Sequence, residues 1–218
     1  MKSQLLLLPI TLLSLSLSSC SKGVILPSGY GDYYDSKVRQ FMEDNKTIGD
    51  VDVCYLGDSL TDLYDVNKWF PEYKNANRGI GGDTTDGLAY RIKPSAYEIK
   101  PKVITFWIGF NNLETMFNNY ESILKGLHKN LPDSKIAIIG FTPNTWGRQE
   151  QVLSANPKVK KIAEKYSHPY VDLYDYLLDN STGTINAEYT IDGGHFTEKG
   201  YEIITSILKP VIDDLMKG

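Results

Sequence analysis

The stretch KVITFWIG at residues 102–109 decides the fold, because it packs β-branched and aromatic residues together and ends on a glycine. A near-continuous apolar run of this length is typical of a strand buried on both faces of a parallel sheet. Similar runs occur at VDVCYLG (51–57), KIAIIGF (135–141) and HPYVDLY (168–174), and YKNANRGI (73–80) could form a further short strand. The sequence therefore predicts about five strands.

Helical patterns occupy the segments between these runs. Tyr34, Val38, Phe41 and Met42 follow helical spacing. Further helices are expected at 84–92, in the apolar stripe 113–131, from Asn156 as N-cap with Pro157 at the first helical position, and from about residue 197. Strands that alternate with helices indicate a parallel sheet covered on both faces. We predict one doubly wound, flavodoxin-like α/β domain over residues 32–218, with mostly parallel strands.

Composition places the chain among ordinary globular proteins. It has 218 residues, 41% of them hydrophobic and 23% charged, and a formal net charge of −4. This charge gives no electrostatic footprint for nucleic acid. No heptad series or short internal repeat stands out, which disfavours coiled coils and solenoids.

The first 19 residues have the layout of a secretory signal peptide, with one lysine, a leucine-rich run and then small residues. The apolar run is shorter than the roughly 20 residues that a spanning helix needs. Residues 17–20, LSSC, resemble the lipobox of bacterial lipoproteins, which implies cleavage before Cys20, lipidation of its thiol and a tether over residues 20–31. The alternative is a plain signal peptide with Cys20 incidental. We expect an exported, membrane-anchored protein, periplasmic or at the cell surface.

Cysteine usage gives no disulfide framework on this interpretation. The chain holds two cysteines, and lipidation of Cys20 would leave Cys54 as the remaining thiol. Cys54 lies within an apolar strand candidate, so we expect a buried residue that behaves as a small hydrophobe. The hydrophobic core would then have to provide the stability of the domain.

Polar, glycine-marked turns follow three of the predicted strands. These are GDSL (57–60), GIGGDTT (79–85) and GFNN (109–112), while TIDGGHFTEKGY (190–201) comes just before the last helix. In open α/β sheets, ligands bind beyond the carboxyl ends of the strands. A serine, an asparagine, an aspartate and a histidine are therefore predicted to meet at one edge of the sheet.

This set of residue types is suited to acyl transfer. A serine hydroxyl needs a base to take its proton, and histidine, with an ordinary pKa near 6.5, is largely neutral at pH 7. A carboxylate orients the imidazole, and a glycine N–H and an asparagine amide can stabilise an oxyanion. Each part alone has a simpler interpretation, with Ser59 as a helix cap and Asn111 as a turn residue. His128 is expected to be solvated and His168 structural.

Other glycine-rich motifs fit the sequence poorly. The dinucleotide pattern G-x-G-x-x-G from Gly79 would need glycine at Thr84, and the P-loop would need a lysine in GGDTT. The elbow G-x-S-x-G fails at Thr61. Asp192 and His195 lack a convincing third metal ligand, so we predict no metal and no cofactor.

The turns also resemble a known family. GDSL at 57–60, a glycine before DT at 82–84, GxN at 109–111 and DxxH at 192–195 are similar to the four marks of the GDSL, or SGNH, hydrolases. Within that family, GIGGDTT and WIGFNN look most like the catalytic subunits of the intracellular platelet-activating-factor acetylhydrolases. The resemblance spans nearly the whole mature chain.

The resemblance implies a role for each matching residue. Ser59 would be the nucleophile, His195 the base and Asp192 the residue that orients the base. The oxyanion hole would comprise the backbone N–H groups of Ser59 and Gly82 and the side-chain amide of Asn111. Many family members carry Asp where this chain has Asn112, although the acetylhydrolase branch also carries Asn.

A second departure concerns the residue before His195. Many family members carry an apolar residue there, and this chain has Gly194. The glycine removes a packing anchor, so we expect the histidine loop to be mobile unless Phe196 holds it.

These observations predict a secreted serine esterase that acts on acyl, most simply acetyl, esters of carbohydrate. The alternatives are a lipid esterase related to lysophospholipases or platelet-activating-factor acetylhydrolase, and a non-catalytic glycan-binding lipoprotein. Candidate substrate contacts are Asp58, Asn112, Asn144, Trp146 and Arg148. The partners expected are a small ester or acetylated glycan, and a membrane through Cys20; the sequence leaves the oligomeric state open.

Overall fold

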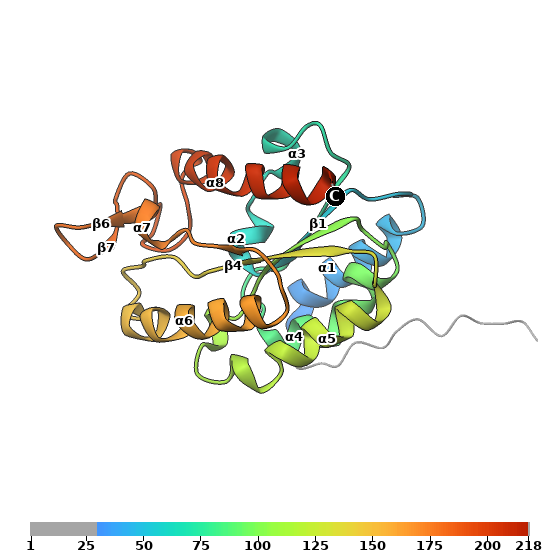
Figure 1. Ribbon diagram of the computed structural model, residues 1–218, viewed down its shortest axis with the longest axis horizontal. Helices are drawn as coiled ribbons and strands as arrows, with labels where there is room; N and C mark the ends of the chain where they lie inside the picture. The colour runs from blue at the N-terminus through green and yellow to red at the C-terminus, as the bar shows by residue number, and fades with distance from the viewer. Residues whose placement is uncertain (1–29, 218) are drawn as a thin grey trace, which may run out of the picture.

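A five-stranded parallel sheet forms the centre of the computed structural model, which describes residues 30–217 (Figure 1). The strand order is β2-β1-β3-β4-β5, the doubly wound order of flavodoxin-like folds. The strands are β1 (Val53–Gly57), β2 (Asn75–Gly79), β3 (Val103–Trp107), β4 (Lys135–Ile139) and β5 (Tyr170–Val171). Every neighbouring pair in this sheet is parallel, so the predicted fold class is confirmed.

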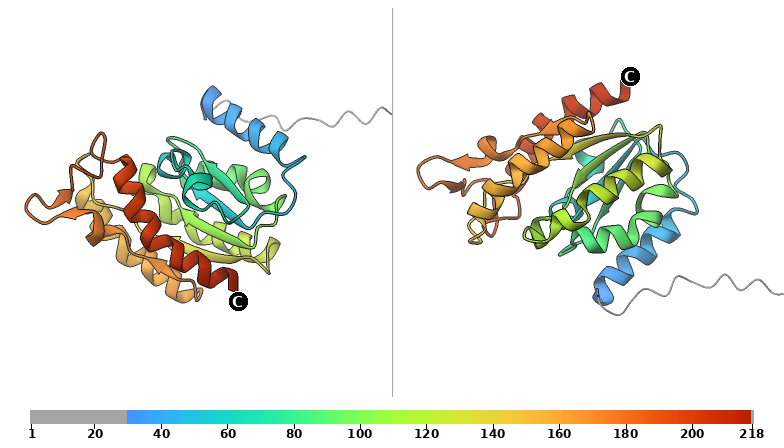
Figure 2. Two further views of the ribbon diagram at one scale, coloured as in Figure 1. Left: turned by 90° about the horizontal axis from the view of Figure 1, so that it is seen from above. Right: turned by 60° about the horizontal axis from the view of Figure 1, so that its bottom comes forward.

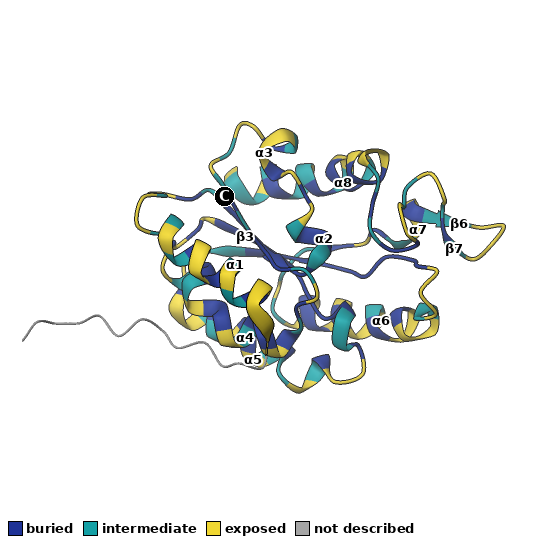
Figure 3. Cartoon of the chain, turned by 180° about the vertical axis from the view of Figure 1, so that it is seen from behind, coloured by how far each residue is buried: buried dark blue, intermediate teal, exposed yellow. Residues whose placement is uncertain are grey.

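Helices connect the strands and cover both faces of the sheet (Figures 1 and 3). The α-helices are α1 (Gly31–Asp44), α2 (Ser59–Asp62), α3 (Val66–Trp69), α4 (Thr85–Ile92), α5 (Tyr120–Asn130), α6 (Gln149–Lys165), α7 (Tyr174–Leu177) and α8 (Glu198–Lys217). Shorter helical turns are η1 (Lys93–Tyr97), η2 (Phe110–Asn112) and η3 (Met116–Asn118).

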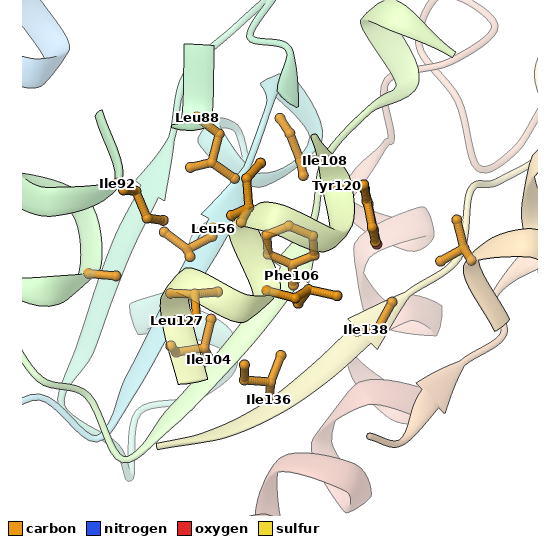
Figure 4. Close-up of a cluster of buried hydrophobic side chains, with 14 of the residues drawn as sticks. Leu56, Leu88, Ile92, Ile104, Phe106, Ile108, Tyr120, Leu127, Ile136 and Ile138 are labelled. Atoms are coloured by element: carbon orange, nitrogen blue, oxygen red, sulfur yellow. The ribbon is translucent and has the colours of Figure 1, made fainter. Parts of the chain in front are cut away.

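Successive strand residues point to opposite faces, which divides the core into two layers. Cys54 and Leu56 of β1 pack with α4, α5 and α6, together with Phe106 of β3. Figure 4 shows Leu56 and Phe106 of this layer. Val53 and Tyr55 pack instead with α2, α3 and α8. Burial on both faces explains why the strands read as continuous apolar runs. Cys54 is fully buried, as the sequence predicts.

The register of the central strands places three turns side by side. Gly57 at the end of β1 pairs with Gly79 of β2 on one side and with Trp107 of β3 on the other. The segments that follow these three residues therefore leave the sheet at the same level. They contain Ser59, the GIGGDTT turn and Asn111, so the fold itself assembles the candidate site.

Helix α6 corrects one sequence prediction. The sequence places a helix start at Asn156 and Pro157, but α6 begins at Gln149 and continues through Pro157. The Asn156 side chain caps no helix; it forms two hydrogen bonds of 2.8 Å with the backbone of Phe141. Because proline has no N–H, its place inside α6 costs one helical hydrogen bond.

A small antiparallel hairpin of β6 (Leu178–Asp179) and β7 (Thr184–Ile185) adds to the predicted elements. It extends from one end of the body in Figures 1 and 2, away from α1. At the other end of the chain the domain starts slightly earlier than predicted. Gly31 already belongs to α1, and the ring of Tyr30 stacks on Tyr34 at 4.7 Å.

The predicted signal peptide, Cys20 and most of the tether lie outside the described residues. Within residues 30–217, none of the helices has the length and apolar character needed to cross a bilayer.

Candidate active site

Three side chains from two distant parts of the chain form one hydrogen-bonded line at the carboxyl edge of the sheet. Ser59 Oγ lies 2.9 Å from His195 Nε2. His195 Nδ1 lies 2.6 Å from Asp192 Oδ2. The sequence separates Ser59 from His195 by 136 positions, and the strand order and the docking of α8 bring them together. This geometry permits a proton to pass from the serine hydroxyl to the imidazole.

The position of Ser59 follows from a tight turn after β1. Ser59 is the first residue of α2, and the buried Asp58 caps this helix by accepting a hydrogen bond from Leu60 N at 3.1 Å. A side chain at Gly57 would lie 2.0 Å from Thr61 Oγ1, so glycine lets α2 start directly at the strand end. The hydroxyl of Ser59 is thereby held at the surface above the sheet.

Asp192 holds the histidine loop in shape as well as orienting the imidazole. Its Oδ1 accepts the backbone N–H groups of Gly194 at 3.1 Å and His195 at 2.9 Å. Burial raises the pKa of Asp192, but the hydrogen bonds from the His195 ring and from these amides outweigh it and lower the pKa overall. The carboxylate therefore stays ionised at neutral pH and can stabilise an imidazolium.

Phe196 anchors the same loop from below. Its ring is buried, stacks on Trp107 at 6.0 Å and meets Tyr201 edge-on at 5.4 Å. Gly194 leaves space that Trp146 fills. The indole N–H of Trp146 donates to the carbonyl of Asp192 at 2.9 Å. The loop thus has two aromatic supports in place of the missing side chain.

The GIGGDTT turn lies beside Ser59, because a Cβ on Gly81 would be 4.0 Å from Ser59 Cβ, and the N–H of Gly81 itself donates to Asp62. Gly82 has φ +76°, a left-handed conformation that favours glycine, and nothing lies within 4 Å of the position of its missing Cβ. Gly79 is needed for a different reason, because a side chain there would lie 2.2 Å from Asp62 N. Thr84 caps α4 by accepting from Gly87 N. The close packing at Gly79 and the cap at Thr84 fix the two ends of the turn, and Gly82 between them is exposed.

Asn111 links this turn to the one after β3. Its Nδ2 donates one hydrogen bond to the carbonyl of Asp83 at 2.8 Å. An amide nitrogen has two hydrogens, so the second stays available in a fixed orientation. The side chain of Asn112, by contrast, accepts from Thr85 N at 3.2 Å and donates to the hydroxyls of Thr85 at 2.9 Å and Thr115 at 3.3 Å.

A buried arginine missed by the sequence analysis ties these turns together. Arg91 Nε contacts Asp83 Oδ2 at 2.7 Å, and both side chains are buried. Its other nitrogens donate to the carbonyls of Arg78 at 2.7 Å and Gly57 at 2.9 Å. One side chain therefore braces the ends of β1 and β2 and the turn that contains Gly82. The sequence around Arg91 gives no sign of this role, because the groups that Arg91 contacts come from other segments of the chain.

The predicted substrate contacts divide into two groups, and two predictions need correction. Asp58 is 3% exposed and caps α2, while Asn144 is 2% exposed and accepts from the backbone of Trp146 and Arg148. Burial removes both from contact with a substrate, and it also raises the pKa of Asp58 to about 7.

Trp146, Arg148 and Asn112 remain beside the site. Arg148 and Asn112 line a pocket of about 260 Å³ together with Asn111. Trp146 is 39% exposed, and its ring meets that of His195 at 4.9 Å, edge to face. Contact of these three side chains with a substrate stays a prediction.

Comparison with known proteins shows the family to which the chain belongs. The model of the GDSL-like lipase/acylhydrolase family matches residues 55–203. The chain belongs to this family. Platelet-activating factor acetylhydrolase IB subunit alpha2 of Homo sapiens is 32% identical over 202 residues, which cover 85% of this chain and 86% of that protein.

Solved structures of lipases and esterases share the fold. A GDSL-like lipase from Bacteroides thetaiotaomicron superposes with a TM-score of 0.73 at 20% identity, over 84% of this chain and 99% of its own. A variant acetyl xylan esterase from Geobacillus stearothermophilus gives 0.60 at 19% identity, over 75% and 95%. As a member of this family, the protein is a carboxylic ester hydrolase.

Proposed function

We propose that this esterase works through a Ser59 acyl-enzyme. His195 Nε2 takes the proton of Ser59 as Oγ attacks the ester carbonyl, and a tetrahedral oxyanion forms. The C–O bond to the alcohol then breaks, and His195 gives its proton to the departing oxygen. Water, deprotonated by His195, releases the acyl group by the same steps in reverse. The observation that carries this proposal is the unbroken line from Ser59 through His195 to Asp192.

In this mechanism, three N–H donors would stabilise the oxyanion. They are the N–H of Ser59 at the start of α2, the N–H of Gly82 and the second amide hydrogen of Asn111. The first N–H groups of a helix have no partner within it. The hydrogen bond from Asn111 to Asp83 and the ion pair of Asp83 with Arg91 support the arrangement. Donors held in place in this way lower the barrier without reorganisation.

We propose acetyl esters of carbohydrate as the substrates. The site is flanked by the exposed aromatic rings of Trp146 and Tyr33 and lined by polar side chains, features that suit a sugar ester. The fold shared with acetyl xylan esterases is consistent with this choice. A lipid esterase is the second candidate, favoured by the identity with platelet-activating factor acetylhydrolase subunits.

We also propose export as a lipoprotein, with lipid on Cys20 and the domain at the membrane surface. The support is the arrangement of residues 1–20 in the sequence. Metabolic labelling with a fatty acid tests this, with Cys20→Ser as the matched variant. Label on both proteins, or on neither, would contradict the proposal.

A substrate panel tests the catalytic proposal and separates the two substrate classes. Acetylated xylooligosaccharides are compared with short-acyl and long-acyl phospholipids, with Ser59→Ala as the control for background hydrolysis. We expect the highest kcat/KM on the acetylated sugars and none of these activities in Ser59→Ala. A preference for the phospholipids would assign the enzyme to the second class, and equal rates in Ser59→Ala would overturn the mechanism.

A further inference from the structure

The first turn of α1 brings an exposed tyrosine next to the nucleophile. A Cβ on Gly81 would lie 3.5 Å from Tyr33 Cε1 and 4.0 Å from Ser59 Cβ. One glycine therefore separates the ring of Tyr33 from the side chain of Ser59. Tyr33 is 55% exposed, so this ring faces solvent beside the reacting atoms. Trp146 lies against His195, so the serine–histidine pair has an exposed aromatic ring beside each member.

Tyr33 belongs to a pocket that includes the proposed oxyanion turn. The pocket has a volume of about 410 Å³. Its walls comprise the N-terminal residues of α1 with three tyrosines and the turn around Gly82, and its lining includes Tyr30, Asp32, Tyr33, Tyr34, Gly82 and Asp83. A ligand in this pocket would therefore be next to a carbonyl held at Gly82.

Hydrogen bonds and stacking fix the rings of this pocket. The hydroxyl of Tyr33 donates to Asp62, which also accepts from Gly81 N at 3.0 Å and from Lys37 at 2.8 Å. The bond to Asp62 raises the pKa of Tyr33 to about 12, so it remains a donor. Tyr34 donates to the carbonyl of Gly87 at 2.7 Å and supports Tyr30. Binding to rings already held in place costs little conformational entropy.

The charges of the pocket disfavour an anionic ligand. Its ionisable lining groups besides the tyrosines are Asp32, which is exposed, and Asp83, which is paired with Arg91. Neither lysine nor arginine is among the described residues that line it, so a phosphate would find no cation there. An aromatic face suits the C–H face of a sugar ring, and a carboxylate accepts hydroxyl groups.

We propose that this pocket is a subsite for one neutral sugar ring of the esterified alcohol, stacked on Tyr33 with hydroxyls toward Asp32. The inference rests on the proposed function and deepens it by naming the part of the substrate that α1 recognises. Tyr33 acts here as a specificity residue, since it favours an acetylated sugar over an acetyl ester with no ring.

The test compares two substrates in three variants. The substrates are an acetylated xylooligosaccharide and ethyl acetate, which has no ring to stack. Tyr33→Leu should lower the ratio of kcat/KM for the sugar over that for ethyl acetate by about tenfold, mainly through KM on the sugar. Tyr33→Phe keeps the ring and should stay within about threefold of wild type. The control is Tyr176→Leu, at a 60% exposed tyrosine on α7, which should leave the ratio unchanged.

The outcomes separate this inference from the proposed function. An unchanged ratio in Tyr33→Leu, with the wild-type enzyme active on acetylated sugars, would overturn the subsite and leave the function standing. A wild-type enzyme that does not hydrolyse acetylated sugars would overturn both the subsite and the proposed substrate class. The thermal midpoint of Tyr33→Leu and its labelling by a fluorophosphonate establish that the variant is folded. A lower ratio of kcat/KM for the sugar over ethyl acetate then reflects weaker binding of the sugar.

Discussion

The indole ring of Trp146 occupies the space that a side chain at Gly194 would fill. A Cβ on Gly194 would lie 2.4 Å from Cη2 and Cζ2 of this ring. Gly194 precedes His195, and Trp146 bonds to the Asp192 carbonyl. A loop beyond β4 therefore supports the histidine loop, and the glycine makes this contact possible.

Gly194→Ala should displace the indole and disturb His195. We expect kcat/KM to fall about tenfold or more and stability to fall by about 1–3 kcal/mol, the usual cost of overpacking. Steady-state kinetics and urea unfolding measure the two effects. The control is the same substitution in Trp146→Ala, where the ring is absent and the added cost should largely vanish. Equal costs in both backgrounds would show that the contact is unimportant.

Asn111→Ala should remove one oxyanion donor. We expect kcat to fall by about 10²–10³-fold with little change in KM, because the bond forms mainly in the transition state. Asn130→Ala is the matched control, since its amide donates to the Gly126 carbonyl on α5. A rise in KM with normal kcat would instead mark Asn111 as a binding residue.

Arg91→Met should destabilise the fold and the site together. Loss of the arginine leaves Asp83 buried and unpaired, which costs about 3–5 kcal/mol. It also frees the carbonyls of Gly57 and Arg78, so kcat should fall as well. Arg91→Lys should not restore stability, because the compact ammonium cannot span the three partners that the planar guanidinium reaches. Lys46→Met, at an exposed ion pair with Glu43, should change stability by less than about 1 kcal/mol. Similar losses in the two methionine variants would contradict this account.

Acid should destabilise the enzyme through His168. Burial, and then the nearby His128, lower the pKa of His168 to about 4. The two rings stack with Nε2 atoms 3.0 Å apart, and Tyr166 stacks on His128. The unfolded chain binds this proton near pH 6.5 and the folded chain near pH 4, so stability falls as pH drops through that window.

Urea unfolding at pH 7.5 and pH 5 measures this effect. His168→Gln removes the titrating group, and we expect the difference in unfolding free energy between the two pH values to shrink. The same difference in wild type and variant would assign the acid sensitivity to other groups.

The fold could be predicted from the sequence because its strands are buried on both faces. Runs such as KVITFWIG carry that signal locally, and the glycines at the strand ends mark the turns. Asn156 and Pro157 misled the prediction because their pattern is typical of a helix start. Here tertiary packing overrides it, since Asn156 bonds to Phe141 and α6 continues through the proline.

The candidate site could be predicted only in part, because some of its residues are placed by tertiary packing that leaves no local signal. Ser59, Asn111 and the loop of His195 follow strand ends or glycines, so their position can be inferred from topology. Tyr33 and Arg91 lie within helices, and their contacts depend on how α1 and α4 pack. No local pattern in the sequence specifies that packing. Asp58 and Asn144 sit in the right turns but face inward, which sequence position alone does not reveal.

The central claim is that Ser59 is a nucleophile activated by His195. Labelling with a fluorophosphonate probe, followed by mass spectrometry of the modified peptide, tests it most directly. We predict one label on Ser59 in the wild-type enzyme, none in Ser59→Ala and much slower labelling in His195→Gln. A wild-type enzyme that is not labelled, or a Ser59→Ala variant labelled equally well, would contradict the account.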